Sequence, residues 1–185
     1  MTQYSKIYKN FFISGKPGAG KTTLVREVTL PILDRAGGFY TEEILDESGK
    51  LSGFKLKTLS GLEGILASKN LKSVNKLNKY GIDLNVLESM GVKALTDALR
   101  DKELIVIDEL GTMAAISGAF REAFVKCVAS EKKLLATLRY NSQPYTQETS
   151  MMVNSFVVTL TNENYPEIKQ QLKYWLEQGN TKEVK

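Results

Sequence analysis

The sequence predicts an α/β fold, a three-layer α/β/α arrangement with a mostly parallel central sheet and an antiparallel β-meander at one side. Two patterns predict it. Fully apolar runs such as residues 104–107 are typical of strands buried on both faces of a parallel sheet, and predicted helices alternate with them. A glycine-rich loop also joins the first strand to the first helix. The length of 185 residues fits one domain covering residues 1–185.

The first predicted strand, residues 10–14, leads into this loop, and a helix is expected from about residue 21 to residue 34. The loop has the pattern G-x-x-x-x-G-K-[ST] and consists of Gly15, Lys16, Pro17, Gly18, Ala19, Gly20, Lys21 and Thr22, with Thr23 next. This pattern is the phosphate-binding loop signature. Glycines let backbone N–H groups point at a pyrophosphate, and the following helix adds its free N–H groups and positive dipole end. Lys21 is expected to reach the β- and γ-phosphates and the Thr22 hydroxyl to ligate Mg²⁺.

Residues 38–68 have the composition of a β-rich insertion. Pro31 favours either a kink in the first helix or an early end of it, and Gly37 and Gly38 are predicted to stop it and permit a tight turn. Three short strands joined by glycine-containing turns then predict an antiparallel meander. This segment is too small to carry a core of its own, so we expect it to flank the nucleotide site.

The next segments are predicted from polarity and helical spacing. Residues 69–83 are polar, rich in Lys and Asn, and predicted to be a loop, a candidate lid over the site. Residues 84–100 have apolar side chains at helical intervals and are predicted to form two helices broken at Gly91.

The second half of the chain supplies three more strands. They are predicted at residues 104–108, 134–138 and 156–160, with helices at 117–130 and 165–178 and one further helix proposed after Pro144. Trp175 shares the apolar face of the last helix, and Cys127 lies in the apolar stripe of helix 117–130. Both spacings favour packing over a ligand platform or a reactive thiol.

Composition excludes several classes of function. There is no histidine, so a His-based metal site or an imidazole base is excluded, and any general base must be a carboxylate or a bound water. The net charge is +4, and the densest cationic cluster, around Lys69–Lys79, has no interleaved aromatic residues, which disfavours nucleic acid as a partner. The sequence has no apparent signal peptide or membrane-spanning apolar run, and one cysteine cannot form an internal disulfide. These features predict a cytoplasmic protein.

Asp108 and Glu109 end the apolar strand at residues 104–108. Since ligands bind at the carboxyl ends of parallel strands, both carboxylates are expected beside the phosphate loop. Asp108 is predicted to hold Mg²⁺ and Glu109 to polarise a water for attack on the γ-phosphate. Lys21 and Glu109 are therefore the predicted catalytic residues. The pairing resembles the P-loop ATPase branch with an extra catalytic glutamate. That resemblance implies that strand 134–138 lies between the other two, with Thr137 or Arg139 sensing the γ-phosphate.

Nearly the whole chain resembles a known family. The matching stretches are residues 15–24, 36–44 (Ala-Gly-Gly-Phe-Tyr-Thr-Glu-Glu-Ile), 53–55, 65–67, 79–84, 87–92, 94–95, 104–111, 135–137 and 161–164. They are similar to the THEP-type nucleoside-triphosphatases, P-loop NTPases whose relatives include the human cancer-related nucleoside-triphosphatase. The resemblance implies Mg²⁺-dependent hydrolysis of several nucleoside triphosphates with little base selectivity. It leaves the role of Glu42 and Glu43 open.

Three segments depart from the pattern of that family. Thr112 and Ala114 stand where Lys and Glu are usual, Tyr165 stands where Arg is usual, and Lys16 replaces an Arg in the loop. If the missing cations neutralise transition-state charge in relatives, hydrolysis here is weaker or needs an arginine from an activating protein partner.

Two other functions stay open at this point. One is a kinase that passes the γ-phosphate to a small molecule or a nucleic-acid end, although such enzymes usually close an Arg-rich lid, for which Arg35 and Arg139 offer little. The other is a nucleotide-binding switch, since residues 108–111 match D-x-x-G, but the Asn-Lys-x-Asp guanine motif is absent. Phosphate release without an acceptor would favour the hydrolase over both.

Overall fold

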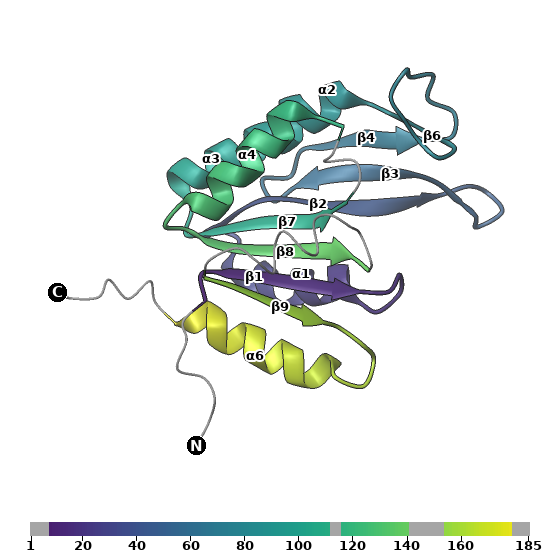
Figure 1. The fold of residues 1–185 in the computed structure, drawn as a ribbon. Coiled ribbons are helices and arrows are strands. Elements are labelled where there is room, and N and C mark those ends of the chain that lie inside the picture. Colours follow the sequence, from purple (N-terminus) through teal and green to yellow (C-terminus); the bar gives the residue numbers. More distant parts are fainter. Residues whose placement is uncertain (1–7, 112–115, 141–153, 179–185) are drawn as a thin grey trace.

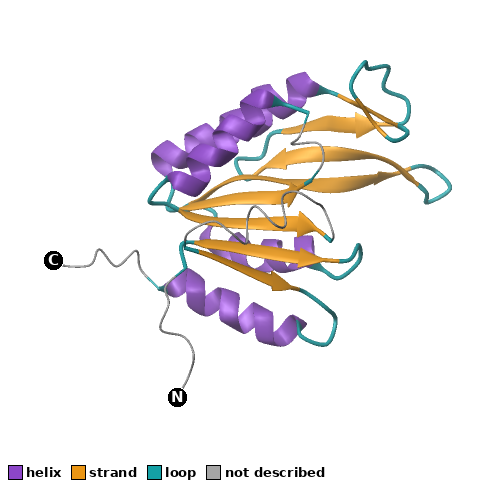
Figure 2. Cartoon of the chain, viewed as in Figure 1, coloured by secondary structure: helices purple, strands orange, loops and turns teal. Residues whose placement is uncertain are grey.

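The structure is a computed structural model that describes residues 8–111, 116–140 and 154–178. Figures 1 and 2 show its helices and strands. In chain order these are β1 (Asn10–Gly15), α1 (Lys21–Thr29), a 3₁₀ turn (Leu30–Ile32), β2 (Ala36–Leu45), β3 (Leu51–Thr58), β4 (Glu63–Ser68), β5 (Lys76–Leu77), β6 (Tyr80–Ile82), α2 (Leu84–Val86), a π-helical segment (Leu87–Val92), α3 (Lys93–Asp101), β7 (Leu104–Leu110), α4 (Gly118–Ala129), β8 (Lys133–Arg139), β9 (Ser155–Thr159) and α6 (Tyr165–Glu177).

All the described strands join one sheet, in the order β5-β6-β4-β3-β2-β7-β8-β1-β9. The pairs from β2 to β9 are parallel, and those from β2 to β5 through β3, β4 and β6 are antiparallel. The predicted fold class is confirmed, and β8 lies between β1 and β7 as the resemblance implied. The expected insertion is only partly separate, however, because β2 starts as a parallel partner of β7 and then pairs with β3.

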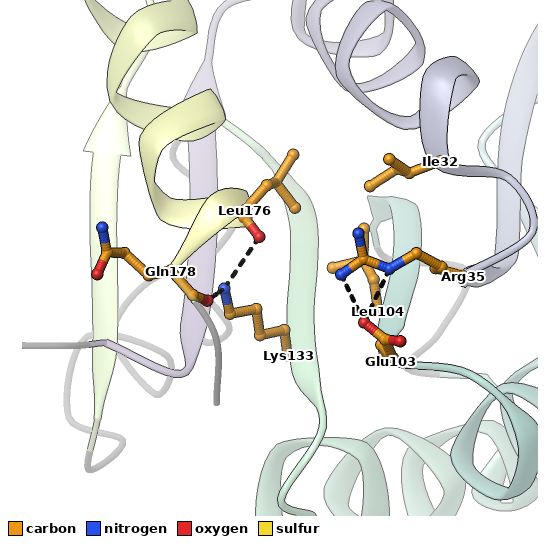
Figure 3. A pocket seen from close by; sticks show the side chains of 7 residues that line it. All are labelled: Ile32, Arg35, Glu103, Leu104, Lys133, Leu176 and Gln178. Carbon is orange, nitrogen blue, oxygen red and sulfur yellow. Dashed lines mark hydrogen bonds and ion pairs between the residues drawn. The ribbon is translucent and has the colours of Figure 1, made fainter. Parts of the chain in front are cut away.

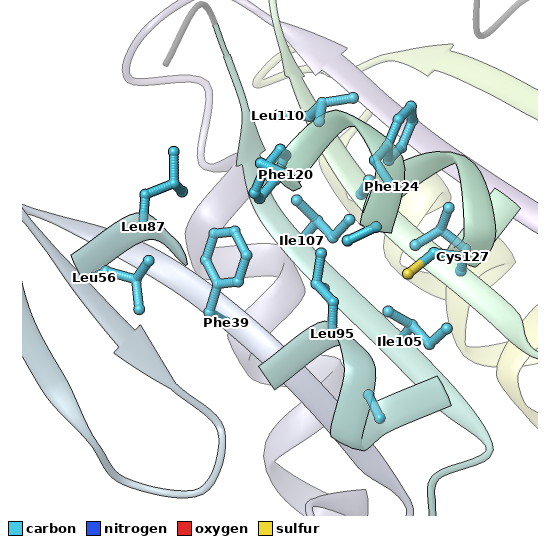
Figure 4. Close-up of a cluster of buried hydrophobic side chains, with 14 of the residues drawn as sticks. Phe39, Leu56, Leu87, Leu95, Ile105, Ile107, Leu110, Phe120, Phe124 and Cys127 are labelled. Atoms are coloured by element: carbon cyan, nitrogen blue, oxygen red, sulfur yellow. The ribbon is translucent and has the colours of Figure 1, made fainter. Parts of the chain in front are cut away.

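Helices cover both faces of the sheet (Figure 1). Phe11 and Ile13 of β1 belong to the core cluster under α1 and α6, whereas Phe12 belongs to the cluster under α3 and α4. On β7, Ile105 and Ile107 likewise face the second cluster (Figure 4), and the residues beside them face the first. Alternate side chains thus enter two cores, which explains the continuous apolar runs; full burial of each such side chain contributes about 1.5–3 kcal/mol.

The glycine pair at residues 37 and 38 was predicted as a helix stop and turn, and this prediction was wrong. The first helix ends earlier, at Thr29, followed by the 3₁₀ turn that contains Pro31. Gly37 and Gly38 lie inside β2. Gly38 has φ 111°, and a Cβ there would lie 2.0 Å from the carbonyl oxygen of Val106, so only glycine allows β2 to approach β7 this closely.

The helical run after residue 84 is not broken into two helices at Gly91. The chain stays helical from α2 through the π-helical segment to α3. Gly91 is buried there, and a Cβ would lie 3.2 Å from Leu56 Cδ1 of the meander. The glycine therefore allows close packing of the helix on β3 rather than ending the helix.

Residues 69–83 are not a lid over the phosphate loop. They contain the short hairpin of β5 and β6 at the edge of the sheet, far in strand order from β1. Tyr80 and Ile82 are buried, and the Tyr80 ring packs edge-on against Phe54 with centroids 5.5 Å apart. Because the segment is mostly polar, its composition did not indicate that these two side chains are buried.

The packing roles predicted for Trp175 and Cys127 are confirmed. Trp175 is buried against Phe11, with ring centroids 5.4 Å apart, and its Nε1 donates to the carbonyl of Tyr8. Cys127 is fully buried, and burial raises the pKa of its thiol to about 12. The helix proposed after Pro144 lies outside the described residues. No helix in the part of the chain that the structure describes has the length and apolarity to span a membrane.

Candidate active site

The predicted phosphate loop connects β1 to α1 at the carboxyl edge of the sheet (Figure 1). Gly18 and Gly20 have φ of 80° and 85°, a left-handed conformation that favours glycine. Gly20 immediately precedes α1, which has no side-chain cap among the described residues. The N–H groups of its first turn are thus oriented to bind an anion.

Lys21 is folded back onto the loop. It is 8% exposed, and its Nζ donates to the carbonyls of Gly15 and Lys16 at 2.9 and 3.4 Å. The same Nζ lies 3.4 Å from Oε2 of Glu109, which is 30% exposed. The two predicted catalytic residues, although 88 positions apart in sequence (109 − 21), are therefore an ion pair at the edge of the sheet.

Asp108 lies beside this pair and is completely buried. Its Oδ1 accepts a hydrogen bond from the Thr137 hydroxyl on β8, whereas Oδ2 has no hydrogen-bond partner in the described structure. Burial raises the pKa of Asp108 to about 6, and hydrogen bonds from Thr137 and Thr22 partly oppose that shift. The register of β7 on β8 shifts between Ile107 and Leu110, so both carboxylates lie in an irregular part of the strand.

The residues present fit a magnesium ion. The Thr22 hydroxyl and the Asp108 carboxylate approach each other, and both are hard oxygen ligands. The partnerless Oδ2 of Asp108 supplies a further buried acceptor. Within the described ranges no three His, Cys, Asp or Glu side chains gather as a metal cage. Mg²⁺ in nucleotide sites commonly takes one or two protein ligands, with phosphates and waters completing its shell.

The other sequence candidates have different surroundings. Glu42 accepts from Arg26 at 2.8 Å and lies 3.3 Å from Lys57 Nζ, while Glu43 is exposed. Of the two residues suggested as γ-phosphate sensors, Thr137 is bound to Asp108 and Arg139 is exposed at the end of β8. Lys16 of the loop is exposed, with its Nζ 6.0 Å from the centroid of the Tyr140 ring.

Two contacts were not predicted from the sequence. One is the bond between Thr137 and Asp108, for which the signal was a hydroxyl near the end of the adjacent strand. The other is Tyr165, whose ring contacts Gly20 of the phosphate loop. Its position before a proline at the start of a helix gave no such signal, and the one pointer was the family resemblance, in which Tyr165 stands where Arg is usual.

A pocket lies at the opposite, amino edge of the sheet (Figure 3). It is lined by Ile32, Arg35, Glu103, Leu104, Lys133, Leu176 and Gln178. Arg35 is paired with Glu103 at 2.6 Å, and Lys133 donates to backbone carbonyls of α6 and the residue after it. The pocket is remote from the phosphate loop, and its charged groups are already engaged with one another or with backbone.

Comparisons with known proteins agree with this geometry. The model of a family described as NTPase matches residues 10–172. The nucleoside-triphosphatase THEP1 of Thermotoga petrophila is 43% identical over 164 residues, 89% of this chain and 90% of that protein. The Methanocaldococcus jannaschii THEP1 is 40% identical over 133 residues, 70% of this chain and 78% of that protein.

Two solved structures share the fold. The crystal structure of THEP1 from the hyperthermophile Aquifex aeolicus aligns with a TM-score of 0.82 and 29% identity, covering 91% of this chain and 99% of that one. The solution structure of a human cancer-related nucleoside triphosphatase aligns with a TM-score of 0.75 and 25% identity, covering 91% and 97%. Sequence, fold and the loop between β1 and α1 thus lead to one assignment: the chain belongs to the THEP1-type family of nucleoside-triphosphatases.

Proposed function

We propose that this enzyme hydrolyses nucleoside 5′-triphosphates to the diphosphate and phosphate with Mg²⁺, accepting ATP, GTP, CTP and UTP alike. The observation that carries the proposal is the contact of Lys21 with Glu109 next to buried Asp108. Breadth toward the base is supported by the names of the relatives, which refer to nucleoside triphosphates as a class.

Each residue has a separate role in this proposal. The loop from Gly15 to Thr23 binds the phosphates through its backbone N–H groups, and Lys21 leaves the loop carbonyls to contact the β- and γ-phosphates. Thr22 and Asp108 would hold Mg²⁺, which when bound neutralises phosphate charge. Thr137 fixes the orientation of the Asp108 carboxylate through its hydrogen bond.

Glu109 orients the attacking water and takes up its proton. Its side chain is partly exposed, so water reaches it, and Lys21 lies 3.4 Å away. The sequence contains no histidine, and Glu109 is a carboxylate placed at the proposed site to act as the general base. Such a base typically contributes about 10²–10⁴-fold to the rate.

We further propose that the enzyme is cytoplasmic, acts on free nucleotides rather than nucleic acid, and does not bind a membrane. The single cysteine is buried and cannot pair within the chain. The cationic segment around Lys69–Lys79 lies at the β5–β6 edge of the sheet, away from the phosphate loop, which supports a solvated surface there.

The test is Mg²⁺-dependent phosphate release from all four ribonucleoside triphosphates, compared with Glu109→Gln. We expect release from each with the wild type, and a loss of about 10²–10³-fold in kcat with unchanged nucleotide binding in Glu109→Gln. Glu43→Gln is the matched control, because Glu43 is an exposed carboxylate on β2. If wild-type protein binds nucleotide but releases no phosphate, the hydrolase proposal fails, and an acceptor or an activating protein must be sought.

A further inference from the structure

Tyr165, the first residue of α6, lies directly against the phosphate loop. A Cβ built on Gly20 would be 3.0 Å from Cε2 and 3.4 Å from Cδ2 of the tyrosine ring, so one edge of the ring contacts the loop backbone. The ring itself is half-buried. An aromatic side chain therefore stands next to the residue that opens α1, where the phosphates are expected to bind.

The ring is also held in place at its far end. The Tyr165 hydroxyl donates to Oε2 of Glu27 on α1 at 3.0 Å, and Glu27 is paired with Lys169 of α6 at 2.8 Å. Burial, together with the bond to Glu27, raises the pKa of Tyr165 to about 12, so the hydroxyl remains a donor at neutral pH. A ring fixed in this way binds a flat partner with little loss of side-chain entropy.

The sheet order gives the direction in which a nucleotide must extend. Asp108 and Glu109 lie on β7, which is separated from β1 by β8, whereas β9 and α6 lie on the other side of β1. In the proposed function the γ-phosphate faces Glu109. The α-phosphate, ribose and base then extend away from β7, toward the β9–α6 connection that ends at Tyr165.

Three polar residues of that connection, Thr161, Glu163 and Asn164, are hydrogen-bonded within it. Both atoms of the Asn164 amide are used: Oδ1 accepts from the Thr161 N–H at 2.8 Å and Nδ2 donates to the Thr159 carbonyl at 2.9 Å. The Thr161 hydroxyl accepts from the Asn164 N–H, and its side chain is also hydrogen-bonded to Glu163. Among the described residues of this connection, Asn164 and Thr161 therefore already have hydrogen-bond partners, whereas the Tyr165 ring adjoins the phosphate loop and has a flat face suited to contact a base.

We propose that the ring of Tyr165 stacks on the nucleobase of the bound nucleotide. This contact would determine the base specificity of the site, which is broad because stacking is possible with any base. The proposal rests on the proposed function for the direction of the nucleotide. Every base presents a π-face, so stacking without edge contacts gives affinity with little discrimination among bases. Purines, which have the larger ring system, gain more from it than pyrimidines.

The test compares equilibrium binding of ADP, CDP and inorganic tripolyphosphate, with Mg²⁺, to wild type, Tyr165→Phe and Tyr165→Leu. Loss of the ring in Tyr165→Leu is expected to weaken ADP binding roughly 10-fold and CDP binding less, with tripolyphosphate within about twofold of wild type. Tyr165→Phe keeps the ring and is expected to stay close to wild type for all three. Tyr174→Leu, at an exposed tyrosine of the same helix, is the matched control.

Two results would overturn the proposal. An equal loss of ADP and tripolyphosphate affinity in Tyr165→Leu would mean that the ring only supports Gly20. Unchanged ADP affinity would mean that it does not contact the base. If Tyr165→Leu fails to fold, the wild-type protein alone provides the test. Stacking requires that ADP binds more tightly than CDP, and that GDP binds about as tightly as ADP. Equal affinity for ADP, CDP and tripolyphosphate would refute stacking. Binding is measured without turnover, so a protein that binds but does not hydrolyse would refute the proposed function and leave this test intact.

Discussion

Two lysines in the described part of the chain are almost completely buried, and they lie at opposite edges of the same sheet. Lys21, 8% exposed, follows the phosphate loop at the carboxyl edge, and Lys133, 7% exposed, begins β8 at the amino edge. Both donate to backbone carbonyls. Burial and hydrogen bonding alone therefore do not distinguish the lysine proposed to act on substrate from the other one.

The identity of their partners does distinguish them. Lys133 donates to the carbonyls of Trp175, Leu176 and Gln178 at the end of α6, and its Nζ lies 5.0 Å from the Trp175 ring centroid. Three carbonyls match the three donors of an ammonium group, and a helix C-terminus favours a cation. Lys21 instead contacts a glycine-containing loop and the carboxylate of Glu109. Lys133 caps the C-terminal end of α6, whereas Lys21 is placed to exchange its partners for a ligand.

The largest expected difference comes from the same substitution at the two lysines, beginning with Lys21→Met. We expect a loss of at least about 100-fold in phosphate release and much weaker nucleotide binding, because the phosphates lose their positive partner. The free energy of unfolding should fall by only about 1 kcal/mol, since one buried carbonyl, that of Gly15, loses a short hydrogen bond and the bond to Lys16 is already long at 3.4 Å. Steady-state kinetics, calorimetric binding and urea denaturation measure these effects. Phosphate release at the wild-type rate in Lys21→Met would show that Lys21 does not act on the substrate, and its proposed difference from Lys133 would then be wrong.

Asp108→Asn tests whether the ionised, buried carboxylate of Asp108 at the carboxyl edge of the sheet destabilises the folded protein. The folded-state pKa of Asp108 is raised from 3.8 to about 6, so between these values the native state binds more protons than the unfolded state. Stability of the wild type then falls as pH rises through this interval. Without Mg²⁺ or nucleotide, Asp108→Asn should be more stable than wild type by on the order of 2 kcal/mol above pH 6, and about equal to it below pH 4.

Denaturant titrations at pH 4 and pH 7.5 measure this dependence, with Asp34→Asn, at an exposed position, as the control. A gain of the same size at both pH values would show that the ionised form of Asp108 is not the cause. Asp108→Asn should also lose Mg²⁺-dependent activity, so the variant that is more stable is the one that is less active.

Lys133→Met is the structural counterpart of Lys21→Met. Methionine can fill the apolar part of the space but leaves the carbonyls at the end of α6 without a donor. We expect a loss of about 1–2 kcal/mol in the free energy of unfolding, with kcat and KM within about twofold of wild type. A large loss of activity in the folded variant would mean that the amino edge is coupled to the active site, which contradicts the comparison.

The same contrast explains how much could be predicted from the sequence. Local signals placed the loop after β1 and the carboxylates after the apolar run of β7, because motif and strand period depend on neighbouring residues. The position of β8 between β1 and β7 followed only from the resemblance to P-loop ATPases. The partners of Lys133 and Tyr165 could not be predicted, since each contact joins distant segments: Lys133 and Trp175 are 42 positions apart, and Tyr165 and Glu27 are 138 apart. Gly37 and Gly38 were misread for a related reason, because the close neighbours that require glycine belong to other elements: Ala98 of α3 for Gly37 and Val106 of β7 for Gly38.

The smallest predicted effect, that of Lys9→Met, is a stringent test of the separation between the two edges. Lys9 directly precedes β1, the strand that leads into the phosphate loop, and its Nζ donates to the carbonyls of Val128 and Ser130 at the end of α4. It is less buried than Lys133 and has fewer carbonyl partners, so we expect a loss of only about 0.5–1 kcal/mol in the free energy of unfolding and no change in kcat. Because Lys9 and Lys133 cap different helices, the loss in the double variant should equal the sum of the single losses within about 0.5 kcal/mol. A drop in phosphate release in Lys9→Met, measured on folded protein, would show instead that β1 transmits changes from the amino edge of the sheet to the phosphate loop.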